Sequence, residues 1–184
     1  MTYDHVPEPW EAFLREIDDH LDDRTELHCI GGFVIAMLYG LERPTSDVDV
    51  ISCEPRSHSG KLFKFAGIDS ELYKKHRLYL QHVGVAKLPE NYEERLTEMF
   101  PGEFKKLRLL AVEPHDLALS KLDRNTSRDR EDVLHLAKTV PLDLHLLKTR
   151  YMEELRYQVH NESREDLTIK LWIDMIEEAR ENQD

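Results

Sequence analysis

The chain has 184 residues and a mass of 21.7 kDa, which predicts one compact domain, with room for a small helical appendage. Hydrophobic residues make up 40% and charged residues 34%, and no apolar run approaches the roughly 18 residues of a membrane span. This composition excludes collagen-like, coiled-coil and membrane-spanning proteins. The net charge of -12 argues against a protein that coats nucleic acid and against stable DNA binding.

The only two cysteines, Cys29 and Cys53, are not part of a CxxC pair, which excludes a disulfide framework and a zinc-finger spacing. Both lie beside apolar, strand-like segments, so we expect them to be small core residues. The first ten residues have neither the basic nor the apolar stretch of a secretory signal. We therefore expect the protein to be cytoplasmic.

The charge is unevenly distributed along the chain. Residues 61–130 carry 14 basic and 11 acidic side chains, whereas both flanking regions are acidic. The acidic net charge does not exclude a polyanionic substrate at one local basic site, and this middle third is where such a site would be built. Its basic residues fit either a path for RNA or triphosphate or a solvated face that balances neighbouring acids, and we favour the solvated face. The residues concerned are Lys74, Lys75, His76, Arg77, Lys105, Lys106 and Arg108.

The hydrophobic pattern predicts helices and strands in the following order. In the first part of the chain, helices are expected at 10–21, 33–39, 61–65 and 89–100, and strands at 27–30, 48–52, 78–86 and 107–112. After Pro114, which suits a first helical turn, helices are expected at 116–123, 127–138, 142–157 and 163–180. Gly40 is expected to end the second helix, and Ser163-x-x-Asp166 to begin the last one. We predict an α/β core at 1–113 and a helical region at 114–184, packed as one continuous structural unit.

The segment Asp47-Val48-Asp49-Val50 carries two acids at alternate positions of an expected strand. A period of two places both carboxylates on one side, about 7 Å apart, and both valines on the other. Neighbouring carboxylates repel each other unless a cation lies between them. Mg²⁺ prefers such hard oxygen ligands and keeps positions open for water and phosphate. Asp47 and Asp49 are therefore candidate metal ligands.

Gly31 and Gly32 end the preceding strand and begin a helix. Glycines allow close backbone approach, and the free N–H groups of a helix N-terminus favour a phosphate. A lone D-x-D is typical of a solvated turn, and a lone Gly-Gly of a loop. Together, in the order strand, Gly-Gly, helix, strand, they indicate transfer of a nucleotide from a triphosphate.

These residues resemble the active-site signature of the polymerase β-type nucleotidyltransferase superfamily. More narrowly, they resemble AbiEii-type and related bacterial nucleotidyltransferases, whose members include toxins of toxin–antitoxin systems. The matching residues are Gly31, Gly32, Gly40, Arg43, Thr45, Asp47, Val48 and Asp49. The resemblance implies an α+β fold, with a small mixed sheet and flanking helices followed by a C-terminal helical bundle.

A second stretch also resembles the family. A helix that bears Lys121 is followed by a basic-Asp-x-x-Asp pattern that contains Asp129 and Asp132. The resemblance implies that Lys121 reaches the triphosphate and that Asp129 is a polar residue of the site. The alternatives are a surface lysine with an extended stem and a solvated carboxylate in a first helical turn. Asp132 and Arg130 are expected to be surface salt-bridge residues.

The sequence departs from the superfamily in one respect. Many members have a third metal-binding carboxylate on a later strand, but the expected strand here carries Gln81 and His82 instead. Neither is a natural Mg²⁺ ligand. Three interpretations remain open: a site with two carboxylates, His82 as the base, or a weakened enzyme.

Taken together, these patterns predict a Mg²⁺-dependent nucleotidyltransferase that moves an NMP from an NTP to a hydroxyl of an RNA such as a tRNA, of a protein or of a small molecule. The expected catalytic residues are Asp47, Asp49, Lys121 and Asp129, and the expected nucleotide ligands are Gly31, Gly32, Arg43, Thr45, Ser46 and Lys121. Arg43 either neutralises pyrophosphate or braces its loop. The resemblance alone adds a toxin role and a cognate antitoxin as partner.

Two further hypotheses compete with this one. A degenerate domain would bind a nucleotide or a partner protein without transfer. Arg130-x4-His135 also fits the loose spacing of HEPN-type ribonucleases.

Ser59-Gly60-Lys61 is similar to the end of a P-loop, but the preceding glycine pattern is missing.

Overall fold

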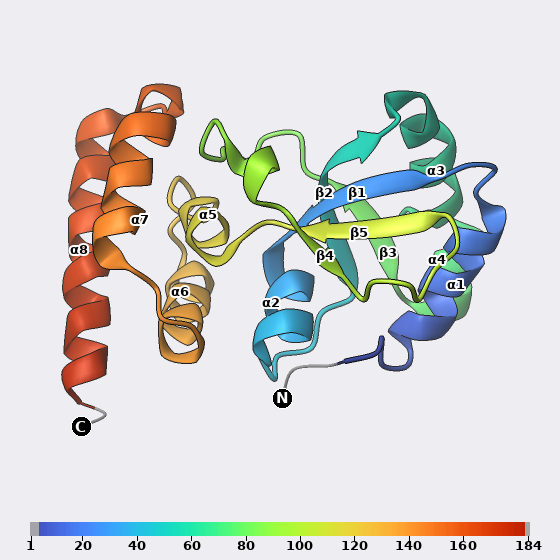
Figure 1. The fold of residues 1–184 in the computed structure, drawn as a ribbon, viewed down its shortest axis with the longest axis horizontal. Helices are drawn as coiled ribbons and strands as arrows, with labels where there is room; N and C mark the ends of the chain where they lie inside the picture. The colour runs from blue at the N-terminus through green and yellow to red at the C-terminus, as the bar shows by residue number, and fades with distance from the viewer. Residues whose placement is uncertain (1–3, 183–184) are drawn as a thin grey trace. The chain divides into compact units, whose positions relative to one another are not determined.

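The computed structural model describes residues 4–182, which form two compact units. The first unit runs to Gly84 and resumes over Leu96–Val112. The second unit consists of Val85–Arg95 and the chain from Glu113 onward. The chain therefore passes between the units three times, and the short segment 85–95 belongs with the C-terminal helices (Figure 1).

A five-stranded mixed sheet forms the centre of the first unit. Its strands are β1 (Thr25–Ile30), β2 (Asp47–Glu54), β3 (Tyr79–His82), β4 (Thr97–Met99) and β5 (Leu107–Ala111). They lie in the order β3-β2-β1-β5-β4, so β3 and β4 are the edge strands. β1 pairs antiparallel with β2 and parallel with β5, β2 pairs parallel with β3, and β4 pairs antiparallel with β5. The expected α+β class, with its small mixed sheet and C-terminal helices, is confirmed.

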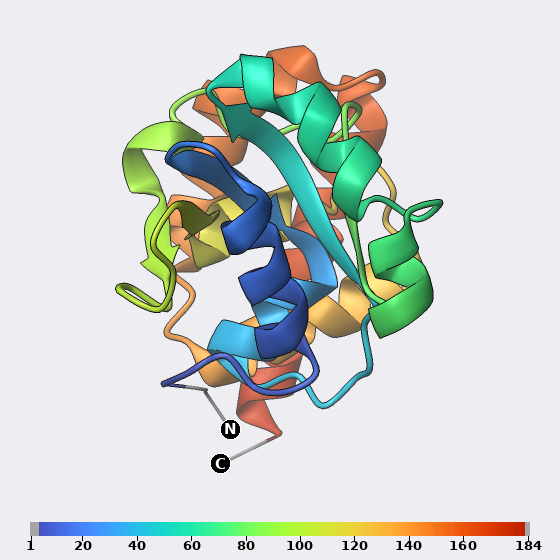
Figure 2. The ribbon, with the colours of Figure 1, turned by 90° about the vertical axis from the view of Figure 1, so that its right-hand side faces the viewer.

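Four helices accompany the sheet: α1 (Trp10–His20), α2 (Gly31–Tyr39), α3 (Ser59–Ala66) and α4 (Glu71–His76), with a 3₁₀ turn η1 (Arg56–His58) before α3. α1 buries the predicted apolar stripe and lies with α3 and α4 on the near side of the sheet in Figure 2. Its Trp10 ring contacts Phe33 of α2 at a centroid distance of 4.6 Å, and its Phe13 ring contacts His76 of α4 at 6.0 Å. These contacts fix α2 and α4 around α1.

The junction between β1 and α2 contains no loop. Ile30 is the last strand residue and Gly31 the first helical one, with a φ of +79° that L-residues rarely adopt. Gly40 ends α2 in the left-handed conformation at φ +69°, as predicted. This abrupt turn brings the start of α2 next to β2.

The second unit contains α5 (Pro114–Leu119), α6 (Ser127–Thr139), α7 (Leu144–Arg150), a π-helical turn η3 (Tyr151–Leu155), a 3₁₀ turn η4 (Arg156–Gln158), α8 (Glu162–Glu181) and the 3₁₀ turn η2 (Tyr92–Arg95). Tyr151 and Trp172 are the largest side chains of its core. Within residues 4–182, no helix combines the length and the apolar composition that crossing a membrane requires.

Several elements differ from the sequence-based expectations. The helix expected at 89–100 is replaced by η2 and β4, because Met99 pairs with Leu109 of β5. α8 is capped by Asn161, which accepts from the Arg164 backbone N–H, and Asp166 instead binds Arg156. Helix α4 was not predicted. The helix expected at 142–157 begins at Leu144, and after Arg150 it continues as the π-helical turn η3 and the 3₁₀ turn η4.

Candidate functional site

The two candidate metal ligands lie at the start of β2. Asp47 and Asp49 are half-buried, whereas Val48 and Val50 are fully buried. This alternation confirms that both carboxylates project from one face of the sheet and both valines from the other. The candidate site therefore contains two neighbouring carboxylates on an interior strand of the sheet.

Gly31 lies directly against one of these acids. A Cβ added to Gly31 would be only 2.2 Å from Asp49 Oδ2, closer than any real contact. In the sheet, Asp49 also pairs with Ile30, the residue that precedes Gly31. The absence of a side chain at residue 31 therefore allows the carboxylate to lie beside the first turn of α2, where free N–H groups favour anions.

Thr45 orients the other acid. Its hydroxyl donates to Asp47 Oδ1 at 2.9 Å. A Cβ at Gly32 would be 3.6 Å from Thr45 Oγ1 and 3.8 Å from Arg43 Nη2, which are ordinary contacts. Gly32, Arg43 and Thr45 therefore surround one small area beside the α2 N-terminus, and Ser46 is exposed next to it.

A groove of the first unit borders the corner formed by Gly32, Arg43 and Thr45. It runs between the segment before α1, the end of α2 and the loop that leads into β2. Residues that line it include Pro7, Trp10, Met37, Glu42, Arg43 and Thr45. Two of the expected nucleotide ligands thus face a concave surface.

Strand β3 supplies the neighbours of the two acids on the outer side of β2. Asp47 pairs with Tyr79, and Asp49 pairs with Gln81. Since laterally paired residues share a face, Tyr79 and Gln81 lie beside the carboxylates. Burial, followed by the charges of Asp47 and Asp49, raises the pKa of the Tyr79 phenol. The sequence did not single out Tyr79, although the period of two from Gln81 would have placed it on the same face.

His82 projects from the opposite face. It pairs with Val50, and its ring contacts Phe63 of α3 at a centroid distance of 5.6 Å. Of the two residues considered for the place of a third carboxylate, Gln81 is therefore the one beside Asp49. The interpretation of His82 as a base beside the acids has no support from this geometry.

The donor set fits Mg²⁺. Two carboxylates offer hard oxygen ligands, and Gly31 leaves room for Asp49 next to backbone N–H donors. In the part of the chain that the structure describes, no group of three or more His, Cys, Asp or Glu side chains is arranged to hold a metal ion. Such an incomplete set leaves coordination positions for water and phosphate oxygens, as Mg²⁺ sites commonly do.

Lys121 and Asp129 lie in the second unit. Lys121 is 4% exposed, and its ammonium donates to Asp132 at 2.7 Å and lies 3.8 Å from Asp129. The alternative of a surface lysine is therefore wrong. The expectation that Asp132 is a surface residue is also wrong, because its side chain is buried against Lys121. The sequence pattern contains Asp132, but it gave no local signal that this side chain would be buried against Lys121.

Asp129 forms the capping box of α6. It accepts from the backbone N–H and hydroxyl of Thr126, and Arg124 forms a two-pronged ion pair with it. Burial opposes its ionisation, but the hydrogen bonds from Arg124 and Thr126 outweigh burial and lower its pKa to about 2. Asp129 is therefore a buried carboxylate that stays ionised, not a solvated one.

Arg130 and His135 do not converge. Both belong to α6, and a step of five positions along the helix places them about 140° apart around its axis. The Arg130 guanidinium donates to the Asn125 carbonyl, before the helix, whereas the Thr139 hydroxyl lies beside His135 near its end. The spacing of a HEPN-type ribonuclease is thus present without a shared site in this unit.

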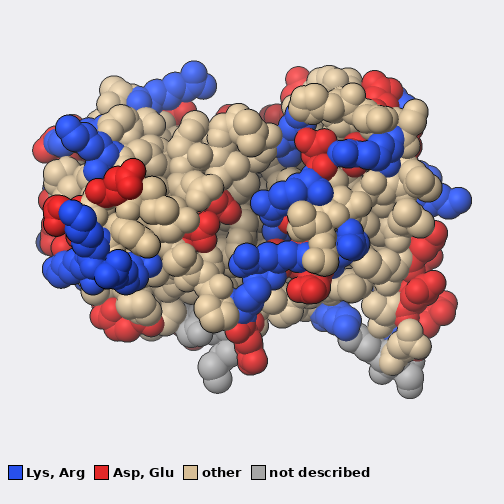
Figure 3. Space-filling view, turned by 180° about the vertical axis from the view of Figure 1, so that it is seen from behind, with Lys and Arg blue, Asp and Glu red and all other residues tan. Residues whose placement is uncertain are grey.

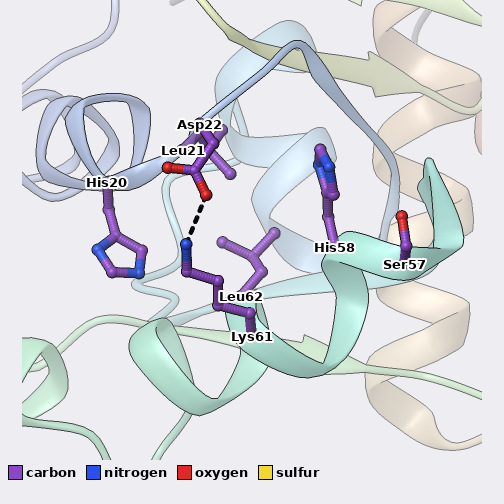
Figure 4. A pocket seen from close by; sticks show the side chains of 7 residues that line it. All are labelled: His20, Leu21, Asp22, Ser57, His58, Lys61 and Leu62. Atoms are coloured by element: carbon purple, nitrogen blue, oxygen red, sulfur yellow. Dashed lines mark hydrogen bonds and ion pairs between the residues drawn. The ribbon is translucent and has the colours of Figure 1, made fainter.

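A small pocket of the first unit lies between the end of α1 and α3 (Figure 4). Lys61 points across it to Asp22, with a distance of 2.6 Å between Nζ and Oδ2. His58, which also lines it, is 2.7 Å from the Thr25 hydroxyl. The lysine of the P-loop-like Ser59-Gly60-Lys61 is therefore paired with a carboxylate in this structure.

The basic residues of the middle third are largely paired with acids. Lys75 and His76 both contact Glu16, Lys74 contacts Glu71, and Arg108 contacts Glu98. Figure 3 shows Lys and Arg side chains interspersed with Asp and Glu side chains on one face of the molecule. These pairs support the interpretation of a solvated, charge-balanced surface.

Both cysteines are buried and free, as predicted. Burial raises the pKa of the Cys29 thiol, with a further contribution from the charge of Asp49, and burial raises that of Cys53 to about 11. Both thiols therefore stay protonated and unreactive near neutral pH.

An α+β fold with an acid pair beside a Gly-Gly helix start resembles the arrangement that the sequence motif led us to expect, that of a nucleotidyltransferase. Residues 11–180 match the family described as "Nucleotidyltransferase of unknown function (DUF6036)", and the chain belongs to this family. The match spans both units. No curated protein and no solved structure matched the chain in the corresponding searches.

Proposed function

We propose that this protein is a Mg²⁺-dependent nucleotidyltransferase that transfers an NMP from an NTP to an acceptor hydroxyl and releases pyrophosphate. Membership of a nucleotidyltransferase family supports the reaction class. The observation that carries the proposal is the position of the Asp47–Asp49 pair, with Thr45 bonded to Asp47 and Gly31 against Asp49. The two proposed metal ligands thus lie beside the N-terminus of α2, whose backbone N–H groups favour anions.

In this proposal, Asp47 and Asp49 hold Mg²⁺, which supplies charge stabilisation for the attacking and leaving oxygens at the α-phosphate. The backbone N–H groups at Gly31 and Gly32 bind phosphate oxygens. Arg43 and the exposed Ser46 hydroxyl add a charge and a donor at the same corner. Thr45 acts mainly by holding the Asp47 carboxylate, since its hydroxyl proton is directed to Asp47.

Lys121 and Asp129 remain proposed catalytic residues through the family resemblance. Within its own unit, the Lys121 ammonium donates to Asp132. An RNA, a protein or a small molecule as acceptor, a toxin role with a cognate antitoxin, and a cytoplasmic location are also proposals that rest on the sequence.

A thermal shift with each NTP and Mg²⁺ tests the proposal without knowledge of the acceptor. A ligand at 100 times its dissociation constant stabilises a protein by about 2.7 kcal/mol. We expect a Mg²⁺-dependent rise in Tm for the wild type and none for Asp49→Asn. Glu54→Gln is the matched control, because it removes a carboxylate from the other end of β2. A shift that survives Asp49→Asn would place nucleotide binding elsewhere.

The second candidate is a degenerate domain that binds a nucleotide or a partner protein without transfer. The presence of only two carboxylates in the described site favours it. If the domain binds a nucleotide, it predicts the same Mg²⁺–NTP shift but no release of pyrophosphate with any acceptor. If it binds only a partner protein, it predicts no thermal shift with any NTP. Pyrophosphate release from labelled NTP, lost in Asp49→Asn, would exclude it.

A further inference from the structure

We propose that Tyr79 and Gln81 form a neutral half of the metal site, which keeps it too weakly charged to hold a divalent cation by itself. The cation would then enter together with the triphosphate. This inference rests on the proposed function for the identity of the ligands. Its test, however, measures metal binding without a nucleotide.

The parallel pairing of β2 and β3 arranges four side chains in two rows. Asp47 lies beside Tyr79 in one row, and Asp49 lies beside Gln81 in the other. The Tyr79 hydroxyl is 3.4 Å from Gln81 Oε1, which joins the two rows on the β3 side. Since β3 is an edge strand, no further strand among residues 4–182 covers this side of the acids.

Neither residue of this neutral half adds negative charge. The Gln81 amide does not ionise, and a tyrosine phenol, whose ordinary pKa is about 10, is protonated near neutral pH. The four side chains therefore carry two negative charges, those of the two acids. A carboxylate at residue 81 would lie beside Asp49 and would be the third carboxylate of this group.

The number of charged ligands sets the affinity of an oxygen site for a divalent cation. Mg²⁺ in particular gives up its water reluctantly and is commonly bound through one or two carboxylates plus substrate phosphates. With two carboxylates, the phosphates of the nucleotide must supply the remaining charged ligands. The site thus distinguishes the metal–nucleotide complex from the free metal.

The test is Mn²⁺ binding in the absence of nucleotide, measured by the electron paramagnetic resonance signal of the free ion. We expect Gln81→Glu to bind Mn²⁺ about tenfold or more tightly than the wild type. His82→Glu is the matched control, because it adds the same charge on the same strand but on the opposite face, beside Phe63. We expect His82→Glu to stay within about twofold of the wild type, since the Asp pair lies across the sheet.

Gln81 and His82 are both exposed, so either substitution is compatible with folding, and Tm without metal checks this. Tyr79→Glu is a second variant, expected to raise Mn²⁺ affinity through Asp47. The gain in Gln81→Glu must disappear when Asp49→Asn is added.

The inference is overturned if the wild type binds Mn²⁺ alone as tightly as Gln81→Glu, or if the gain persists without Asp49. Equal gains in Gln81→Glu and His82→Glu would also overturn it, because a general charge effect would then suffice. Failure of the proposed function has a different signature, namely no NTP-dependent thermal shift in the wild type.

Discussion

The backbone of Gly31 and the carboxylate of Asp49 are in such close contact that a Cβ at residue 31 would lie 2.2 Å from Asp49 Oδ2. Gly31 also has a φ of +79°, so both space and backbone conformation require glycine there. At the neighbouring Gly32, an added Cβ would make only ordinary contacts, at 3.6 Å or more. The two glycines of the motif therefore have different roles.

This difference predicts distinct effects of two alanine substitutions. Gly31→Ala should destabilise the protein by about 2 kcal/mol from the left-handed backbone alone, and should displace Asp49. We expect it to abolish the Mg²⁺–NTP thermal shift. Gly32→Ala should change the free energy of unfolding by less than about 1 kcal/mol, since alanine is tolerated in a first helical turn. Urea denaturation and the NTP shift measure both effects, and equal losses in the two variants would contradict this account.

The hydrogen bond from Thr45 to Asp47 predicts a graded loss of nucleotide binding. Thr45→Val removes a hydroxyl that donates at 2.9 Å, and a bond of this kind contributes about 1 kcal/mol. We expect Mg²⁺–NTP affinity to fall about fivefold in isothermal titration. Thr45→Ser keeps the hydroxyl and should stay near the wild type. Wild-type affinity in Thr45→Val would show that Asp47 needs no such support.

The buried pair of Lys121 and Asp132 predicts strong coupling in stability. Lys121→Met alone leaves a buried carboxylate without its ammonium, which costs about 3–5 kcal/mol. Asp132→Leu alone should cost a similar amount. The double variant should recover much of this loss, because apolar side chains then pack together. A double-mutant cycle of urea unfolding free energies measures the coupling, and additive losses would argue against the pair.

The same double variant separates structure from function at Lys121. If Lys121 binds phosphate, the folded double variant should lose Mg²⁺–NTP affinity although its stability has recovered. Full retention of that affinity would assign Lys121 a purely structural role.

Asp129 predicts a specific dependence of stability on pH. Its pKa is about 2 in the folded protein against a usual value of 3.8, so its ionised form is favoured by folding. The resulting stabilisation, about 2 kcal/mol, is fully present above pH 3.8 and is lost as the pH falls toward 2. The cost of Asp129→Asn should therefore be largest near neutral pH and shrink in acid. Urea midpoints of both proteins across this range give the difference, and a constant difference would contradict the assignment.

The sequence predicted the parts of the site that depend on local order. The alternation at Asp47-Val48-Asp49-Val50 follows from the period of a strand, and Gly40 follows from the left-handed end of a helix. The order of elements in the first unit was recovered for the same reason, apart from α4 and β4. Local pattern was sufficient wherever one strand or helix positioned the residue.

Features set by distant partners were not predicted. β4 exists because Met99 pairs with Leu109, although the acid-rich residues before it suit a helix. Asp132 is buried because Lys121, eleven positions earlier, points at it. The choice between Gln81 and His82 required the β2–β3 register, which no local pattern provides.

Arg95 illustrates a consequence of the three passages of the chain between its units. Its guanidinium binds Asp116 and Glu154, each at 2.8 Å, so segment 85–95 depends on residues that follow Glu113. β5, in turn, pairs with β1, which precedes it by some 80 residues. A single proteolytic cut after residue 84 would therefore separate the first unit from Leu96–Val112, and a cut after residue 112 would separate the second unit from segment 85–95. A cut after residue 95 would divide both units.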